Sequence, residues 1–254
     1  MSKTRINWYK YAAPVNFYPL AGRLVPWFTA LTIILFAIGL YLSFFVAPED
    51  FQQGNSYRII FIHVPAAWMG MFLYVLMAIY AGVGWAFNAR LASMMATAIA
   101  PTGAIFTFIS LVTGSLWGKP AWGVYWVWDA RMTSTLILMF LYIGFISLQA
   151  SIDDPRRADR AGAVLALVGV INVPIIYFSV QWWNTLHQGA TLTARSFKMA
   201  PSMRWAMLVL TFACWMYSIA IVLERVRLII LEREREAPWM AESSPGVQVN
   251  YAVE

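Results

Sequence analysis

Six long stretches of this chain contain no lysine, arginine, aspartate or glutamate. They cover residues 25–47, 59–87, 91–118, 132–152, 161–183 and 205–223. A helix that crosses a bilayer needs about 20 consecutive apolar residues. Helices suit such runs because each one satisfies its own backbone hydrogen bonds in lipid. We therefore predict an all-α fold, a polytopic membrane protein with six transmembrane helices.

The composition excludes several other classes of protein. Of the 254 residues, 61% are hydrophobic and only 12% are charged, whereas soluble domains average about 25% charged residues. No GxxxxGK[ST] phosphate loop is present, so we expect no ATPase site. The single cysteine, Cys214, cannot form an internal disulfide or a CxxCH haem-attachment site. We predict no enzyme activity and no nucleic-acid partner, and we read the net charge of +6 through membrane topology.

The distribution of lysine and arginine predicts the orientation of the chain. With the N-terminus in the cytoplasm, the inner segments hold twelve of these cations and the outer segments hold six. This bias follows the positive-inside rule and predicts that both termini are cytoplasmic. The expected parts are a cytoplasmic segment over 1–24, a six-helix domain over 25–228 and a charged cytoplasmic tail over 229–254. The Arg/Glu run over 224–236 is expected to be a solvated helix extension, with poor order beyond Pro238.

Four tryptophans gather within twelve residues on the predicted outer side, namely Trp117, Trp122, Trp126 and Trp128. Tryptophan prefers the headgroup zone, so an interfacial aromatic belt is one interpretation. The cluster also contains Gly118, Pro120 and Gly123, which break regular structure. A platform for a flat apolar ligand is the other interpretation, and the residues alone favour neither.

The only two histidines, His63 and His187, both fall near the predicted outer face. Either one alone is most simply an interfacial polar residue. Two neutral imidazoles that face each other can bind a metal from both sides. A closed zinc site is improbable without further histidine or cysteine ligands. Two axial imidazoles fit a metal that brings its own equatorial ligands, and haem is such a metal.

Charged residues on the outer side provide the remaining candidates. The cations there include Arg58, Lys119, Arg131, Arg195 and Lys198. Each one alone is most simply a solvated loop residue, but one or two can pair with haem propionates. Exposed pairs of this kind contribute only about 0–1 kcal/mol. Asp129 is expected to cap the helix that begins near Ala130, and orientation of a histidine is its alternative role.

These segments together resemble a known family. The sequence WGVYWVWD at 122–129 is similar to the WGxxWxWD signature of the haem-handling WWD proteins. Its neighbours, WGKP at 117–120, IHVP at 62–65 and WWNTLHQ at 182–188, resemble cytochrome c maturation protein C, the haem exporter protein C family. The resemblance covers the six-span core, roughly residues 20–230.

The resemblance implies a function and a set of site residues. His63 and His187 would be the axial ligands of a transiently bound haem b on the periplasmic side of the bacterial inner membrane. A WWD loop over about 117–131 would hold the macrocycle. The residues expected to bind the cofactor are His63, His187, Trp117, Trp122, Gly123, Trp126, Trp128, Asp129, Arg58 and Arg131.

The family also implies partners. The haem would pass to a periplasmic haem chaperone for c-type cytochrome biogenesis. A small one-span subunit and a pair of ABC transporter subunits would complete a haem export complex. Two alternatives stay open, a b-type electron-transfer cytochrome and a haem-independent permease. The permease is the weaker alternative because the centres of the spans contain few polar residues.

Overall fold

The computed structural model describes residues 8–187 and 199–243, and within these ranges every regular element is helical. In chain order the elements are η1 (Trp8–Ala12), α1 (Pro14–Tyr41), η2 (Leu42–Val46), η3 (Asn55–Ile59), α2 (Ile60–Phe87), α3 (Arg90–Trp122), α4 (Ala130–Ser151), α5 (Pro155–Gly169), α6 (Asn172–Trp182), α7 (Pro201–Arg233) and α8 (Pro238–Ser243). This confirms the predicted all-α fold.

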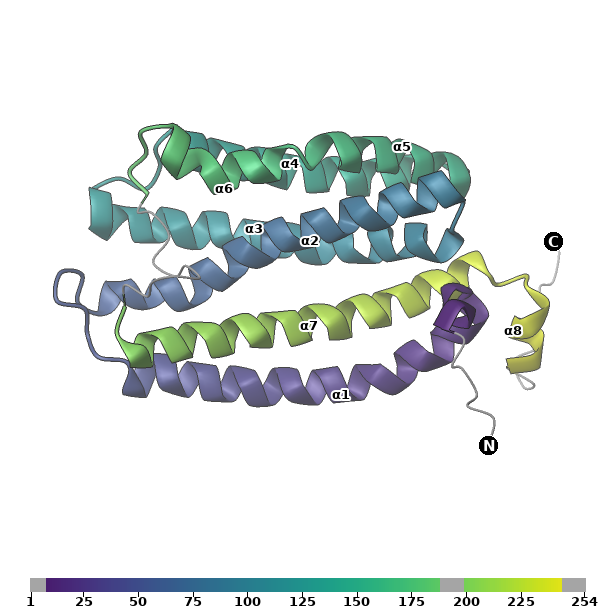
Figure 1. Ribbon diagram of the computed structural model, residues 1–254, viewed down its shortest axis with the longest axis horizontal. Coiled ribbons are helices and arrows are strands. Elements are labelled where there is room, and N and C mark those ends of the chain that lie inside the picture. Colours follow the sequence, from purple (N-terminus) through teal and green to yellow (C-terminus); the bar gives the residue numbers. More distant parts are fainter. Residues whose placement is uncertain (1–7, 188–198, 244–254) are drawn as a thin grey trace, which may run out of the picture.

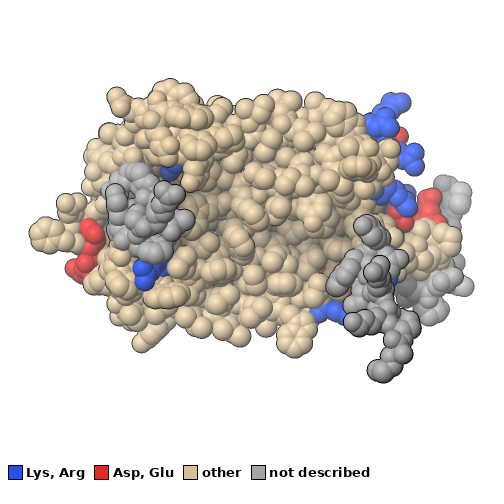
Figure 2. Space-filling view, in the orientation of Figure 1, with Lys and Arg blue, Asp and Glu red and all other residues tan. Residues whose placement is uncertain are grey.

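Six helical segments of the described chain are long and apolar enough to cross a membrane. They are Pro14–Val46, Asn55–Phe87, Arg90–Trp122, Ala130–Ser151, Pro155–Trp182 and Pro201–Arg233. The long helices lie side by side in one bundle (Figure 1). On the face shown in Figure 2, the charged side chains gather toward the two ends and leave an uncharged middle band. The prediction of six transmembrane helices is confirmed.

The alternating direction of the helices creates two distinct ends. The start of α1 and the end of α7 lie together at one end, with the short helix α8 beside them (Figure 1). The opposite end holds the connection from η2 to η3, the connection from α3 to α4 and the residues that follow α6. The described parts of the predicted outer segments therefore lie at one end of the bundle.

Small residues allow the helices of the bundle to approach closely. A Cβ atom added at Gly70 of α2 would lie 2.7 Å from Oγ1 of Thr107 on α3. A Cβ atom at Gly103 of α3 would lie 2.1 Å from the hydroxyl of Tyr142 on α4. Close packing of this kind is typical of membrane helices, which gain little from hydrophobic burial in lipid.

Helix α3 runs further than the sequence predicts. We expected Gly118 and Pro120 to lie in a loop, but α3 continues to Trp122. A proline within a helix removes only one backbone hydrogen bond, and a membrane helix tolerates this loss. The helix ends at Gly123, whose φ of 81° lies in the left-handed region that glycine adopts without strain. The first part of the expected WWD loop is thus helical.

The fifth span is interrupted. Helix α5 ends at Gly169 and α6 begins at Asn172. The Asn172 amide donates a 2.8 Å hydrogen bond to the Ser134 carbonyl of α4. The two residues between the helices, Val170 and Ile171, keep helical dihedral angles, so α5 and α6 together still form one span.

The charged run at the end of α7 differs from the prediction. The helical extension is present to Arg233, but the expected solvated face is wrong for two of its residues. Arg233 makes two-pronged contacts of 2.8–3.1 Å with Asp159 of α5. Glu234 is only 6% exposed and lies 2.8 Å from Arg90 of α3. The run therefore joins helices, because its charges find partners on α3 and α5.

Candidate functional site

His63 lies near the start of α2 and points toward α3. Its Nδ1 atom lies 3.0 Å from the Ser110 carbonyl oxygen and 3.2 Å from the Thr113 hydroxyl oxygen. The ring of Trp117, one turn further along α3, meets the His63 ring edge-on at a centroid distance of 5.9 Å. Helix α3 therefore supplies both hydrogen-bonding oxygens and an aromatic neighbour of this histidine.

His187 lies in the segment that follows α6. Its backbone N–H donates a 3.1 Å hydrogen bond to the Thr185 hydroxyl, which turns the chain inward. Its ring packs against Trp122 at a centroid distance of 4.9 Å. Burial, and then the positive charge of Arg131, lower the pKa of His187 to about 4. The imidazole is therefore neutral at physiological pH, as a metal ligand must be.

A cavity of about 50 Å³ brings the two histidines together. Its wall includes His63 from α2, Arg131 from α4 and His187 from beyond α6, and the other lining residues come from α2, α3, α4 and α6. Residues 124 positions apart in sequence thus share one hollow. The structure brings together the two residues that the sequence singled out as possible metal ligands.

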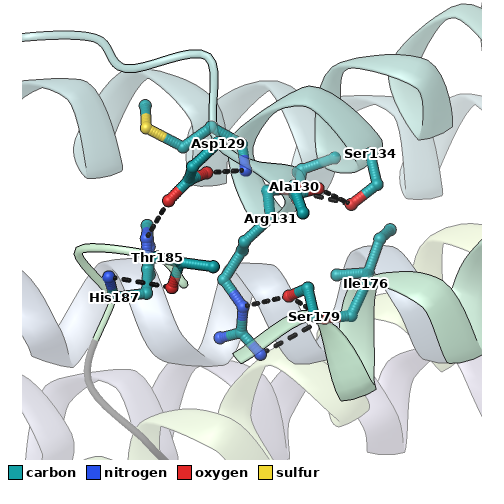
Figure 3. Close-up of polar contacts among 10 residues, drawn as sticks. Asp129, Ala130, Arg131, Ser134, Ile176, Ser179, Thr185 and His187 are labelled. Carbon is teal, nitrogen blue, oxygen red and sulfur yellow. Dashed lines mark hydrogen bonds and ion pairs between the residues drawn. The ribbon is translucent and has the colours of Figure 1, made fainter. Parts of the chain in front are cut away.

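Arg131 stands in the first turn of α4 and faces α6 (Figure 3). Its Nε atom donates to the Ser179 hydroxyl at 3.3 Å, and its Nη2 atom donates to the Ile176 carbonyl at 3.3 Å. These are long contacts with neutral partners. Among the described residues, Arg131 forms no ion pair with a carboxylate, although it lies beside the two histidines.

Asp129 has the predicted role as the N-cap of α4. Its Oδ1 atom accepts a 2.8 Å hydrogen bond from the Met132 backbone N–H. Its Oδ2 atom points to His187 Nδ1 at 3.8 Å, as Figure 3 shows. Within the described chain, three buried polar atoms of this region have no hydrogen-bond partner, namely Asp129 Oδ2, His187 Nδ1 and Trp126 Nε1. Buried polar atoms are normally satisfied, so a site with three orphans has room for a polar ligand or water.

The four tryptophans occupy different positions. Trp117 and Trp122 are on α3, and each contacts one of the two histidines. Trp126 and Trp128 follow in the loop and meet at a ring distance of 5.4 Å, with Trp128 74% exposed. Aromatic surface thus continues from the histidine rings out to the end of the bundle.

The loop from Gly123 to Asp129 folds back on the end of α3. Lys119 donates through its ammonium group to the Gly123 carbonyl at 3.0 Å. The Ser115 hydroxyl donates to the Tyr125 carbonyl at 2.8 Å. Lys119 also lies over the Tyr125 ring at 5.4 Å. These contacts use α3 side chains to hold the loop that carries Trp126 and Trp128.

Arg58 lies apart from the cavity. It donates to the carbonyls of Ser43 and Ala47 and to the side chain of Asn55, the last two at 3.0 and 2.8 Å. Carbonyls at the C-terminal end of a helix lack helical partners, and Arg58 satisfies them at the end of the first span. Arg195 and Lys198, the other outer cations, lie outside the described residues.

Sequence reasoning missed three residues that hold the site. Ser110 and Thr113 contact His63, and the Gln53 side chain accepts a 2.7 Å hydrogen bond from the Trp117 indole. Nothing in the sequence indicates these contacts, because each depends on how two distant segments meet. A helical spacing of four residues between Thr113 and Trp117 was the only available signal that both share one face of α3.

The donor set of the cavity limits which metals it suits. In the described residues no group of three or more histidine, cysteine, aspartate or glutamate side chains is close enough to hold a metal ion. A second hollow of about 700 Å³ lies toward the end of the bundle where α7 ends. Its described lining contains no histidine, cysteine, methionine or tyrosine. Two imidazoles without other ligands fit haem, whose porphyrin provides the equatorial nitrogens.

Comparison with known proteins gives a consistent picture. The family model described as "Heme exporter protein C" matches residues 7–241. The chain is 46% identical to heme exporter protein C of Escherichia coli over 92% of its own length and 95% of that protein. It is 47% identical to the protein of that name from Bradyrhizobium diazoefficiens, over 92% and 89% of the two chains. For the Rhodobacter capsulatus protein the identity is 36%, over 90% and 96%.

The bacterial relatives and the six apolar spans together make this a multi-pass protein of the bacterial inner membrane. The matched region extends from before α1 into α8 and contains the whole candidate site. The chain belongs to the haem exporter protein C family.

Proposed function

We propose that this protein binds haem between His63 and His187 at the periplasmic face of the inner membrane. It then delivers the haem to a periplasmic haem chaperone for c-type cytochrome biogenesis. The observation that carries this proposal is the shared cavity, because its wall contains both histidines and the half-buried Arg131. The names of the relatives, which describe haem exporters, support it.

The proposed role of each residue follows from its surroundings. His63 and His187 bind the iron, which supplies the metal–imidazole bonds that hold the cargo. Arg131 offers a cation to a propionate, and such a pair is stronger where water is excluded. Its partners in the structure are a hydroxyl and backbone carbonyls, which a carboxylate can replace at the guanidinium.

The aromatic groups add apolar contact surface. Trp117 and Trp122 flank the histidines, and the exposed ring of Trp128 lies further out. Fully burying an aromatic side chain contributes about 1.5–3 kcal/mol. Three orphaned polar atoms nearby, among them Asp129 Oδ2, favour a ligand with polar groups at its edge. We keep Arg58 as a weaker candidate, since backbone carbonyls already engage it.

The orientation of the protein completes the proposal. Both termini are cytoplasmic, and the candidate site faces the periplasm. Two observations support this orientation, the bias of lysine and arginine toward the segments at the end of α7 and the location of the start of α1 at that same end (Figure 1). A site at the periplasmic face suits transfer to a soluble acceptor.

The protein acts as a handling component and not as an enzyme. The covalent bond to haem forms on the chaperone, and ATP hydrolysis belongs to separate ABC transporter subunits that assemble with this chain and a small one-span subunit. The haem is haem b, held transiently. A permanent b-type cytochrome is the alternative, and it predicts haem that stays bound in the presence of an acceptor.

Absorption spectra of the detergent-purified protein test the proposal. The wild type should show a Soret band after expression or after addition of haem. His63→Gly and His187→Gly should each shift or lose that band, and free imidazole should restore it, because it can enter the space of the missing side chain. Gln149→Ala at the other end of the bundle is a matched control that should leave the band unchanged.

Two outcomes contradict the proposal. A wild-type protein that takes up no haem contradicts the proposed haem binding. Haem that binds equally well to both histidine variants contradicts the assignment of the two histidines as ligands. For delivery, incubation of the loaded protein with an apo haem chaperone should move the Soret absorbance to the chaperone, and retention on this chain favours the cytochrome.

A further inference from the structure

The Nδ1 atom of His63 is held more firmly than any other histidine nitrogen of the described chain. It lies within hydrogen-bond distance of two oxygen atoms, the Ser110 carbonyl at 3.0 Å and the Thr113 hydroxyl at 3.2 Å. Both oxygens belong to α3, so a single helix sets the position of the ring. The distances fall within the normal range for N–H···O hydrogen bonds.

The chemistry of these two oxygens determines which ring nitrogen carries the proton. A carbonyl oxygen only accepts hydrogen bonds. The hydroxyl of Thr113 directs its single proton to the Ile109 carbonyl at 2.6 Å, so its oxygen also faces His63 as an acceptor. With two acceptors in front of it, Nδ1 must be the protonated nitrogen of the neutral ring. The Nε2 atom is then left with its lone pair for a metal.

Gly114 allows this arrangement. A Cβ atom at position 114 would lie 2.8 Å from Cε1 and 3.3 Å from Nδ1 of His63. The imidazole therefore rests directly on the backbone of α3. Trp117 meets the ring edge-on from the next turn. The ring is confined by the helix on one side and by an indole on another.

The Nδ1 atom of His187 is not fixed by hydrogen bonds in this way. It lies 3.8 Å from Asp129 Oδ2, which is longer than a hydrogen bond, and it has no hydrogen-bond partner in the described chain. The Nδ1 atoms of the two histidines thus differ, because only that of His63 lies within hydrogen-bond distance of a partner. This difference makes His187 an internal reference for any measurement on His63.

We propose that Thr113 is a positioning residue that fixes His63 as the Nδ1–H tautomer and so makes Nε2 its iron-binding atom. The proposal rests on the function proposed above for His63 and names a residue that acts through that ligand. Partners of this kind orient a metal-binding histidine and raise its basicity. A more basic imidazole stabilises ferric over ferrous iron, so Thr113 also lowers the reduction potential of the bound haem.

The haem-free protein provides the first test, because the chain contains only two histidines. Labelling with ¹⁵N-histidine yields four ring nitrogens, and a His187→Asn sample assigns them. The chemical shifts should show His63 protonated on Nδ1. Thr113→Val removes one of the two acceptors and should move the tautomer ratio of His63 toward Nε2–H by about fivefold, the worth of one hydrogen bond. The signals of His187 should stay in place.

Two further variants separate positioning from a general effect on the helix. Thr113→Ser keeps the hydroxyl and should restore the wild-type ratio. Thr211→Val is the matched control, because Thr211 on α7 makes the same bond to the carbonyl four residues earlier, at 2.8 Å, but contacts neither histidine. It should leave the spectrum unchanged. A wild-type His63 protonated on Nε2, or a ratio that Thr113→Val does not alter, overturns the proposal.

The haem-loaded protein provides the second test. The midpoint potential should rise in Thr113→Val and return to the wild-type value in Thr113→Ser, with Thr211→Val unchanged. An unchanged potential in Thr113→Val contradicts the claimed effect on the ligand. If the wild type binds no haem, the proposed function fails, whereas the tautomer measured in the haem-free protein still decides the role of Thr113.

Discussion

The Oδ2 atom of Asp129 faces the Nδ1 atom of His187 at 3.8 Å, and neither atom has a hydrogen-bond partner in the described part of the chain. The other carboxylate oxygen of Asp129 caps α4 at the Met132 N–H. One side chain therefore joins the start of a membrane helix to a candidate ligand. A shift of less than 1 Å would bring the two facing atoms within hydrogen-bond distance.

Substitution of Asp129 should separate its two roles. Asp129→Ala removes both, and the lost cap should lower the free energy of unfolding by about 1 kcal/mol. Asp129→Asn keeps a good N-cap but not the charge, so stability should stay near the wild-type value. Both variants should weaken haem binding by about 10-fold or more, as is typical when the partner of a metal ligand is lost.

The measurements are thermal melting and haem titration of the purified variants. Asp154→Asn is a control for the cap, because Asp154 caps α5 in the same manner, through the Arg157 N–H at 2.8 Å, at the other end of the bundle. It should bind haem normally. Full haem affinity in Asp129→Asn would show that the carboxylate does not support His187.

The pKa of His187 predicts a pH dependence of stability in the haem-free protein. Burial and the charge of Arg131 lower this pKa to about 4, whereas the unfolded chain has the ordinary value of 6.5. Between pH 6.5 and pH 4, His187 therefore binds a proton in the unfolded state but stays neutral in the folded state. The stability contributed by neutral His187 is complete above pH 6.5 and is lost as the pH falls toward 4, by about 3 kcal/mol in total.

Melting curves at pH 7 and pH 5 check this prediction. The wild type should lose more stability between these pH values than His187→Gln, which has no proton to bind. Equal losses in the two proteins would contradict a buried neutral imidazole at this position.

The six spans could be predicted because the length of an uncharged stretch can be read directly from the sequence. The residues at which the helices end were predicted less well. The boundary at Gly123 depends on one left-handed residue, whereas Pro120 stays helical because a single lost hydrogen bond is tolerated. The break between Gly169 and Asn172 has no charge to mark it, so a continuous apolar run concealed two helices.

For the site, the sequence identified residues of unusual chemistry but not their supports. His63 and His187 were found because they are the only histidines, and the structure places them on one cavity. Thr113 and Gln53 are ordinary residues whose importance comes from a partner 50 or more positions away. Arg58 was a candidate because it is a cation of the outer segments. In the structure it donates hydrogen bonds to backbone carbonyls, and no sequence pattern reveals those contacts.

The ion pair between Asp159 and Arg233 should stabilise the end of the bundle where α5 begins and α7 ends. Its side chains are only 16% and 18% exposed, and the contact is two-pronged. Hydrogen bonds to charged groups contribute about 1.5–3 kcal/mol. Asp159→Ala should lower the free energy of unfolding by about that amount and reduce the Tm.

The neighbouring Glu236 provides a matched control for this pair. It is 89% exposed and lies 3.9 Å from Arg235, so Glu236→Ala should change the free energy of unfolding by less than about 0.5 kcal/mol. A double-mutant cycle with Arg233→Ala isolates the pair, and a coupling energy near zero would restore the reading of this run as a solvated face.

The contact between Gly103 and Tyr142 should make the middle of the bundle intolerant of one added methyl group. The Tyr142 hydroxyl donates a 2.8 Å hydrogen bond to the Gly70 carbonyl, which holds α4 against α2. A Cβ atom at position 103 would lie 2.1 Å from that hydroxyl, so Gly103→Ala must displace the ring and break the bond. Overpacking of this kind costs about 1–3 kcal/mol.

Gly144→Ala tests whether the effect is specific to that contact, because a Cβ atom there meets only Leu165, at 3.4 Å. It should be tolerated, since alanine is also the better helix former. A Cβ atom at position 103 would also lie 2.2 Å from Cζ and 2.5 Å from Cε1 of Tyr142, and Tyr142→Leu removes these atoms together with the hydroxyl. The Gly103→Ala/Tyr142→Leu double variant should therefore be more stable than the sum of the two single losses predicts. Strict additivity of the three melting measurements would show that the two residues do not compete for the same space between α3 and α4.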